Sequence, residues 1–161
     1  MDLLLYFSDS EIEYVVGDVQ NDFVRNVHGI SDVGETGMIK FKSNSVGFIK
    51  GTGSSPMKYM FEIDILGENG RIRLYNNGSS YDLYTFSSSE NSSGSKYESL
   101  DLVYSKHNDT PNERMVDAIL SLIEGVETGK QPVSNIQTAI ESVKVIESIK
   151  SSSNNGILIK F

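Results

Sequence analysis

Two carboxylates in the stretch FEIDILGENGRIRLYNNG, residues 61–78, are the groups best spaced for acid–base chemistry. On a strand, Glu62 and Asp64 point to the same face, and two carboxylates on one face can act as a general acid and base. The GENG segment predicts a tight turn that brings Arg71 and Arg73 back along the same face, with Asp64 opposite Arg73. This register favours a structural ladder of ion pairs over a catalytic pair.

The segment GTGSSP, residues 51–56, is the nearest approach to a phosphate-binding loop. A dinucleotide fingerprint needs a helix directly after its glycines, because the helix N-terminus binds the phosphate. Here Pro56 stands at the third glycine position and a strand is expected to follow. The segment is therefore interpreted as a connection between strands rather than a phosphate cradle.

The chain has two histidines and no cysteine, so thiol chemistry is excluded and a histidine-based metal site is not expected. His107 lies just before a predicted helix, where it could touch a polar ligand, and His28 lies in a predicted loop. An exposed loop histidine is the plainer interpretation of each. Neither forms a recognisable Ser-His-Asp arrangement, and no catalytic residue is predicted.

These residues must be positioned by strands followed by helices, which predicts an α+β fold. A short helix at 2–7 is expected to precede a strand at 11–19 and a long polar loop at 20–36. Turn-rich connections then predict an antiparallel, meander-like sheet, and two amphipathic helices are expected to cover one of its faces. The predicted strands of this sheet are 37–42, 46–50, 59–66, 71–75, 81–86 and 97–104. The first helix is expected to start at Thr110, with Glu113 closing a capping box, and the second at Ser134, with Gln137 as its capping partner. A last strand, ILIKF, is expected at 157–161.

The length of 161 residues suits a single domain with an open-faced sheet. A net charge of −8 argues against nucleic acid or an anionic membrane as a partner, and the apolar opening MDLLLYF is too short to span a bilayer. A cytoplasmic location is the default expectation. The sheet face opposite the helices mixes large apolar and aromatic side chains with charges, which predicts self-association through that outer face. The large side chains of this outer face are Met60, Tyr75, Tyr84 and Phe86.

Three parts of the sequence carry a resemblance to a known family: the run EIDILGENGRIRL, DLLLY upstream, and NERMVDAILSLIEGVETGKQPV with the closing helix downstream. On these parts, the chain resembles the C-terminal domain of the Gfo/Idh/MocA oxidoreductases, the glucose-fructose oxidoreductase and inositol dehydrogenase family. The resemblance covers nearly the whole chain, residues 1–161. It implies a fold like the C-terminal domains of dihydrodipicolinate reductase and glyceraldehyde-3-phosphate dehydrogenase. It also implies a parent enzyme that oxidises or reduces a sugar, inositol or nucleotide-sugar with NAD or NADP.

The resemblance implies that this chain lacks the family's N-terminal NAD(P)-binding domain and that no cofactor binds here. The family's catalytic Lys belongs to an E-K-P motif that is absent. If Asp2 is the Asp of the family's H-x-x-D motif, the catalytic His falls two residues before Met1, and the apolar start is the stub of a helix that is normally covered. The alternative is a free-standing, non-enzymatic module for protein association or sugar binding.

For substrate contact, the resemblance carries over one position, Tyr59, which stands where some family members place a substrate-facing tyrosine. A strand-end Tyr that packs on its neighbour is the competing interpretation. Polarity and predicted loop placement add Lys58, Arg25 and His28 as weaker candidates. His107 completes the set of candidate substrate-binding residues.

Overall fold

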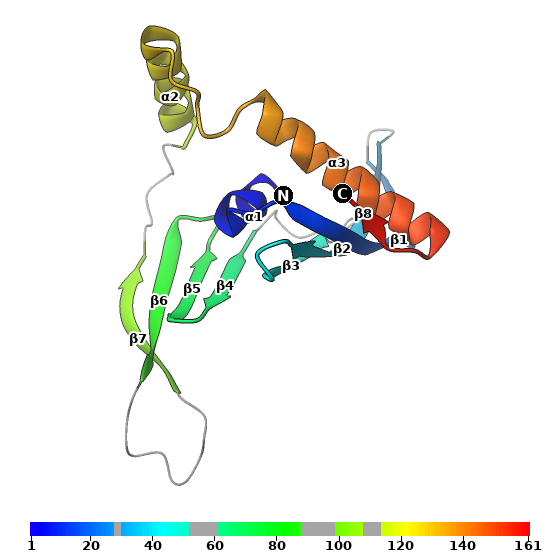
Figure 1. Cartoon of the computed structure of the whole chain (residues 1–161), viewed down its shortest axis with the longest axis horizontal. Helices are drawn as coiled ribbons and strands as arrows, with labels where there is room; N and C mark the ends of the chain where they lie inside the picture. The colour runs from blue at the N-terminus through cyan, green and yellow to red at the C-terminus, as the bar shows by residue number, and fades with distance from the viewer. Residues whose placement is uncertain (28–29, 52–60, 88–98, 108–113) are drawn as a thin grey trace. The chain divides into compact units, whose positions relative to one another are not determined.

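The computed structural model describes the backbone of residues 1–27, 30–51, 61–87, 99–107 and 114–161, while the side chains of 21–33, 87 and 114–115 lie outside the description (Figure 1). The chain divides into two compact units. Unit 1 combines Met1–Pro56 with Ser121–Phe161, and unit 2 is Met57–Leu120. The single domain expected from the sequence stays a prediction, and each unit is described by itself.

Unit 1 contains a four-stranded antiparallel sheet in the order β3-β2-β1-β8. Its strands are β1 (Ile12–Val27), β2 (Ile30–Phe41), β3 (Val46–Gly51) and β8 (Ile159–Lys160). The expected last strand is confirmed, and it pairs with β1 at the edge of the sheet. Helix α1 (Asp2–Ser8) confirms the predicted opening helix.

The predicted long loop at 20–36 is wrong, because β1 and β2 continue through it as a hairpin. The ladder runs from Val19 opposite Glu35 to Val27 opposite Ile30, with an irregularity between Gln20 and Arg25. Asn, Asp, Ser and Gly lower the intrinsic strand preference of this segment. Pairing with a partner strand supplies the missing backbone hydrogen bonds and overrides that preference.

The core of unit 1 lies between its sheet and helix α3 (Ile136–Asn155), which runs along β1 (Figure 1). Five side chains are almost completely buried: Val15, Ile39 and Phe41 from the sheet, and Val145 and Ile149 from α3. They alternate with outward residues along β1 and β2, as expected for a sheet that is covered on one face. Packing of the amphipathic helix on this face is therefore the main source of stability in unit 1.

A pair of glycines lets α3 approach the sheet closely. Gly17 and Gly37 are opposite each other in the ladder between β1 and β2. A Cβ at either position would lie 2.6 Å from a side-chain carbon of Ile149. Ile149 therefore occupies the space that a side chain at these two positions would take.

The start of α3 differs from the prediction by one residue, because Asn135 rather than Ser134 is its N-cap. The Asn135 side-chain oxygen accepts hydrogen bonds from the backbone N–H groups of Gln137 and Thr138, and Thr138 Oγ1 accepts one from the Asn135 N–H. Ser134 instead donates to Asp2 Oδ2 at 3.1 Å. Asn is at least as good a cap as Ser, so intrinsic cap preference does not favour Ser134 over Asn135.

Two serines of α3 continue the edge of the sheet beyond the short strand β8. The backbone N–H groups of Gly17 and Val19 donate to Ser152 Oγ and Ser153 Oγ, each at 3.0 Å. The Ser152 hydroxyl donates in turn to the carbonyl of Ile157 at 2.7 Å, and Ser152 is buried. Side-chain oxygens thus satisfy edge N–H groups that a longer β8 would have satisfied through backbone carbonyls.

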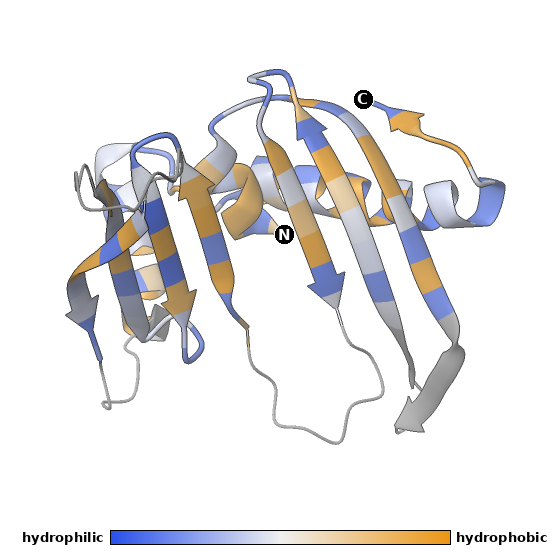
Figure 2. Cartoon of the chain, turned by 90° about the horizontal axis from the view of Figure 1, so that it is seen from below, coloured by the Kyte–Doolittle hydropathy of each residue, from blue (hydrophilic) through white to orange (hydrophobic). Residues whose placement is uncertain are grey.

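Unit 2 is built on a second four-stranded antiparallel sheet in the order β4-β5-β6-β7. Its strands are β4 (Ile63–Gly67), β5 (Gly70–Tyr75), β6 (Ser80–Ser87) and β7 (Ser99–Lys106). Polar and apolar residues alternate along the strands, as Figure 2 shows. The sequence predicts one meander, whereas the strands form two sheets, and the division falls at the Gly- and Ser-rich segment after β3.

Helix α2 (Arg114–Thr128) ends three residues later than predicted, since it continues past Gly125 and stops before Gly129, which has a φ of 72°. The predicted cap at Thr110 lies outside the described residues. Large apolar side chains of α2 are exposed, among them Ile119, Leu120 and Val126. Among the described segments, none of the helices combines the length and apolarity needed to cross a bilayer. Strands and helices together confirm the α+β class.

Candidate functional site

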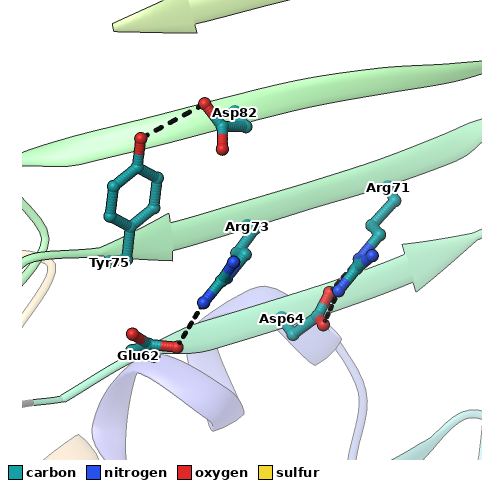
Figure 3. Close-up of polar contacts among 6 residues, drawn as sticks. All are labelled: Glu62, Asp64, Arg71, Arg73, Tyr75 and Asp82. Carbon is teal, nitrogen blue, oxygen red and sulfur yellow. Dashed lines mark hydrogen bonds and ion pairs between the residues drawn. The ribbon is translucent and has the colours of Figure 1, made fainter. Parts of the chain in front are cut away.

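One face of the sheet in unit 2 gathers the charged and hydrogen-bonding side chains that could meet a ligand. We call it the polar face, and six of its residues are drawn in Figure 3: Glu62, Asp64, Arg71, Arg73, Tyr75 and Asp82. Strand alternation places them together, because Asp64 is opposite Arg73 in one ladder and Arg73 is opposite Asp82 in the next. Three neighbouring strand positions therefore form one row of alternating charge.

The two arginines of the polar face are held by carboxylates diagonally across the hairpin. Arg71 donates through two nitrogens to both oxygens of Asp64, with Nε at 2.7 Å from Oδ1. Arg73 Nη2 lies 2.9 Å from Glu62 Oε2. The hydrogen bond from Arg71 lowers the pKa of Asp64. The predicted ion-pair ladder is confirmed, and both carboxylates are engaged by arginines.

Each of these arginines also lies over a tyrosine ring. The Arg71 guanidinium carbon is 5.7 Å from the centre of the Tyr84 ring, and that of Arg73 is 5.5 Å from the centre of the Tyr75 ring. Both distances are within the range of cation–π attraction. The contacts fix the arginines above aromatic surface, so the polar face offers rings and hydrogen-bonding groups side by side.

A cluster of four polar side chains lies at one end of the polar face, on β5, β6 and β7 and on the residue that follows β7. Tyr75 Oη lies 3.3 Å from Asp82 Oδ1 and 2.9 Å from His107 Nδ1. Ser105 Oγ lies 2.5 Å from Asp82 Oδ1 and 3.0 Å from His107 Nε2. Burial, and then the negative charge of Asp82, raise the pKa of the Tyr75 hydroxyl. We call these residues the four-residue cluster.

The predicted substrate-binding residues are only partly described. His107 follows β7, is exposed, and belongs to the four-residue cluster. Arg25 lies on β1 opposite Asp32, but its side chain is outside the description. Lys58, Tyr59 and His28 lie outside the described residues. A role in substrate binding stays a prediction for all five.

Three members of the four-residue cluster were not predicted as ligand-binding residues: Asp82, Ser105 and Tyr75, of which Tyr75 was predicted only for the outer face. A signal for two of them was present, since Tyr75 continues the Arg71 and Arg73 alternation and Ser105 is two residues from His107 on the same strand face. Asp82 becomes visible only once the register of β5 on β6 is known, because it lies opposite Arg73.

The expectation that no cofactor binds this chain stays a prediction. Gly51 ends strand β3, and the next described element is the strand β4, so a helix N-terminus does not follow GTGSSP among the described elements. In the same part of the chain, no group of three or more His, Cys, Asp or Glu side chains could hold a metal. The polar face can bind through hydrogen bonds and aromatic surface, which suits a polyhydroxylated ligand.

No protein-family model matches the chain. An uncharacterized protein of Haemophilus influenzae is 43% identical over 97 residues, a match that covers 60% of this chain and 94% of that protein. The chain and this Haemophilus protein belong to one family. Shared sequence at this level over nearly all of the relative means that the two have the same fold over the matched residues.

Solved structures identify the fold. The WlbA dehydrogenase from Bordetella pertussis, in complex with NADH and UDP-GlcNAcA, is similar with a TM-score of 0.63 and 16% identity, over 99% of this chain and 43% of the dehydrogenase. A super-repressor mutant of Gal80p from Saccharomyces cerevisiae has a TM-score of 0.67 and 17% identity, over 99% of this chain and 46% of its own. The chain has the fold of the C-terminal domain of Gfo/Idh/MocA-type oxidoreductases, as the resemblance implied. It spans less than half the length of these solved proteins.

Proposed function

We propose that this chain is the substrate-binding and oligomerisation domain of an NAD(P)-dependent oxidoreductase that acts on a sugar, inositol or nucleotide-sugar. The single observation that carries the proposal is the fold, since 99% of the chain superposes on part of a dehydrogenase whose structure contains NADH and UDP-GlcNAcA. The cofactor would be held by residues outside this chain, in keeping with the poor fit of GTGSSP to a dinucleotide. This chain would contribute substrate contacts.

The polar face supplies the groups that such contacts need. Tyr75, Ser105 and His107 carry hydrogen-bonding atoms at the exposed end of the sheet, and the Tyr75 and Tyr84 rings provide flat apolar surface. Sugars present hydroxyl groups at their rims and C–H groups on their faces, which match this combination. His107 is the predicted residue that this arrangement favours most among those described.

The test is a titration of the whole chain, followed by ¹H–¹⁵N NMR, with UDP-N-acetylglucosamine and, separately, with NADH. We expect the sugar nucleotide to shift amide signals of β5 to β7, and NADH to leave the spectrum unchanged. A Tyr75→Ala variant should lose the response, whereas a Tyr6→Ala variant, altered at an exposed residue of unit 1, should keep it. Tight NADH binding to this chain would contradict the proposal. The proposal would also be contradicted if none of three ligands changed the spectrum: the sugar nucleotide, free N-acetylglucosamine and myo-inositol.

Self-association through the polar face is part of the same proposal. Tyr84 and Phe86 are on this face, half-buried rather than enclosed, and Tyr84 lies under the Arg71 guanidinium; Met60 lies outside the described residues. Sedimentation velocity should show a dimer or larger species for the wild-type chain and for Tyr84→Phe, and a monomer for Tyr84→Asp, because a buried carboxylate without a partner is costly. An unchanged sedimentation coefficient in folded Tyr84→Asp would exclude this face as the interface.

A free-standing module for protein association or sugar binding is the second candidate, and the similarity to a Gal80p repressor variant favours it, since that protein is named for repression. The reading frame upstream of codon 1 distinguishes the two candidates. An in-frame G-x-G-x-x-G, an E-K-P motif and a His codon two positions before Met1 would establish the oxidoreductase. A stop codon directly upstream of an initiating Met1 would leave the association module.

A further inference from the structure

The core of unit 1 is made from two segments that are far apart in the sequence. One side of it is the sheet. The other side is the closing segment, which we define as residues 135–161 and which contains α3 and β8. Val145 and Ile149 of the closing segment belong to the same buried cluster as Ile39 and Phe41 of the sheet. Unit 2 lies between the two segments in the sequence, so no short connection ties the closing segment to the strands that it covers.

The closing segment also binds the sheet through polar groups. Its Ser152 and Ser153 hydroxyls accept hydrogen bonds from the backbone of β1, each at 3.0 Å. Its strand β8 pairs with β1 in a register that puts Tyr14 opposite Lys160. A second copy of the chain presents the same groups, so its closing segment would make the same hydrogen bonds and bury the same side chains.

The loop that joins α2 to the closing segment, residues 129–133, is held mainly by its neighbours in the sequence. The N–H of Gly129, whose φ is 72°, donates to the Gly125 carbonyl. Lys130 pairs with Glu124 at 3.4 Å. Within the described part of the chain, the hydrogen bonds of this loop run to residues no more than six positions away. The loop can therefore change direction while the closing segment keeps its contacts with a sheet.

The Haemophilus influenzae relative indicates the same division of the core. Its match covers 97 residues, which is 94% of that protein. Phe41 and Val145 are more than a hundred positions apart in this chain, so a continuous stretch of that length contains only one of the two. Such a stretch includes one side of the core, and almost none of that protein remains to supply the other. A second chain can supply the missing side.

We propose that the sheet of unit 1 binds the closing segment of a second copy of this chain, so that two chains exchange these segments and form a dimer. Each core of the dimer then has its strands β1 to β3 from one chain and α3 and β8 from the other. Closure within one chain has to join segments separated by the whole of unit 2, and a long connection lowers the effective concentration of the chain's own closing segment at the sheet. The inference does not depend on the proposed function.

The first test uses engineered cysteines, because the chain has no cysteine of its own. Tyr14 and Lys160 are opposite each other, and antiparallel partners have Cα atoms about 4.5–5.5 Å apart, which suits a disulfide. Full-length Tyr14→Cys and Lys160→Cys chains with different tags are expressed together and oxidised. We expect a covalent heterodimer on a non-reducing gel, in excess over both covalent homodimers, because β8 of one chain lies on β1 of the other.

Ile65→Cys expressed with Ile72→Cys is the matched control. These residues are also direct partners in a ladder, but a tight turn joins their strands within one chain. They should therefore give no covalent heterodimer. If Tyr14→Cys and Lys160→Cys chains with native-like spectra form no covalent heterodimer, the proposal is overturned. An equal yield of heterodimer from the control pair would overturn it as well.

A second pair of variants tests the exchange without cysteines. Ile149→Asp disables the closing segment, and Gly37→Val disables the sheet, because a Cβ at position 37 already lies 2.6 Å from Ile149. A ¹⁵N-labelled Ile149→Asp chain is unfolded and refolded with an unlabelled Gly37→Val chain, so an intact core can form only by exchange. We expect the labelled Gly17 amide, which donates to Ser152 Oγ in the closed core, to regain slow hydrogen exchange in the mixture and to lack it in Ile149→Asp alone. Fast exchange of this amide in the mixture would refute the exchange.

Discussion

Ser152→Ala tests whether side chains of α3 seal the edge of the sheet in unit 1. The substitution removes the acceptor of the Gly17 N–H at 3.0 Å and the donor to the Ile157 carbonyl at 2.7 Å. A buried backbone group without a partner costs about 1–3 kcal/mol. Ile157 is 55% exposed, so water can replace the donor to its carbonyl and most of the cost falls on Gly17. We expect unit 1 to lose about 2 kcal/mol of unfolding free energy, or about 4–8 °C in Tm for a chain of this size.

The assay is urea unfolding followed by far-ultraviolet circular dichroism, with amide hydrogen exchange at Gly17 as the local readout. Ser151→Ala is the matched control, because among the described residues the Ser151 hydroxyl contacts only the side chain of Asn155, at 3.3 Å, and its loss should cost under about 0.5 kcal/mol. Ser153→Ala should fall between the two, since Ser153 is half-buried whereas Ser152 is buried, so water reaches the Val19 N–H more easily after the substitution. Equal stability of Ser152→Ala and Ser151→Ala, with Gly17 exchange unchanged, would refute the reasoning.

Two further predictions concern packing and charge. Gly37→Ala places a Cβ 2.6 Å from Ile149 Cδ1 and should cost about 1–3 kcal/mol of unfolding free energy. Ile149→Val removes that carbon, so in a double-mutant cycle by urea unfolding the double variant should lose less stability than the sum of the two single losses. Strict additivity would argue against the clash. Arg71 lowers the pKa of Asp64 in the folded chain, so this pair stabilises above the pKa of an unfolded Asp and is lost as the pH falls through the lower folded value. The difference in stability between wild type and Asp64→Asn should stay under about 1 kcal/mol because the pair is exposed, and it should shrink below about pH 4. A difference that grows on acidification would contradict this prediction. The same pH profile in the control variant Glu68→Gln would contradict it as well.

Local pattern predicted much of unit 2 and of the helices. The GENG turn and the alternation around it correctly placed Asp64 opposite Arg73. The hydrogen bonds themselves run diagonally, from Arg71 to Asp64, because an arginine side chain is long enough to reach a carboxylate two positions along the partner strand. Register therefore follows from the turn, while the partner of each charge depends on side-chain geometry that the sequence does not contain.

The four-residue cluster could not be predicted from the sequence for a related reason. Tyr75 and His107 are 32 residues apart, and they meet only through two successive ladders, the second with a register shift between Leu83 and Tyr84. A shift by one residue moves a side chain to the opposite face, so His107 would point away from Tyr75 without it. Irregularities of this kind carry no signal in composition or periodicity.

Unit 1 is assembled from the two ends of the chain, and this has a consequence for its synthesis. Val15, Ile39 and Phe41 are made early, yet the side chains that cover them, Val145 and Ile149, are made more than a hundred residues later. At ordinary rates of translation, about 5–20 residues per second, the uncovered sheet face waits for several seconds while unit 2 is being made. The hairpins of unit 2 need only local contacts, which form in about 1–10 μs each. The middle of the chain can therefore fold while the apolar face of the first strands is still uncovered.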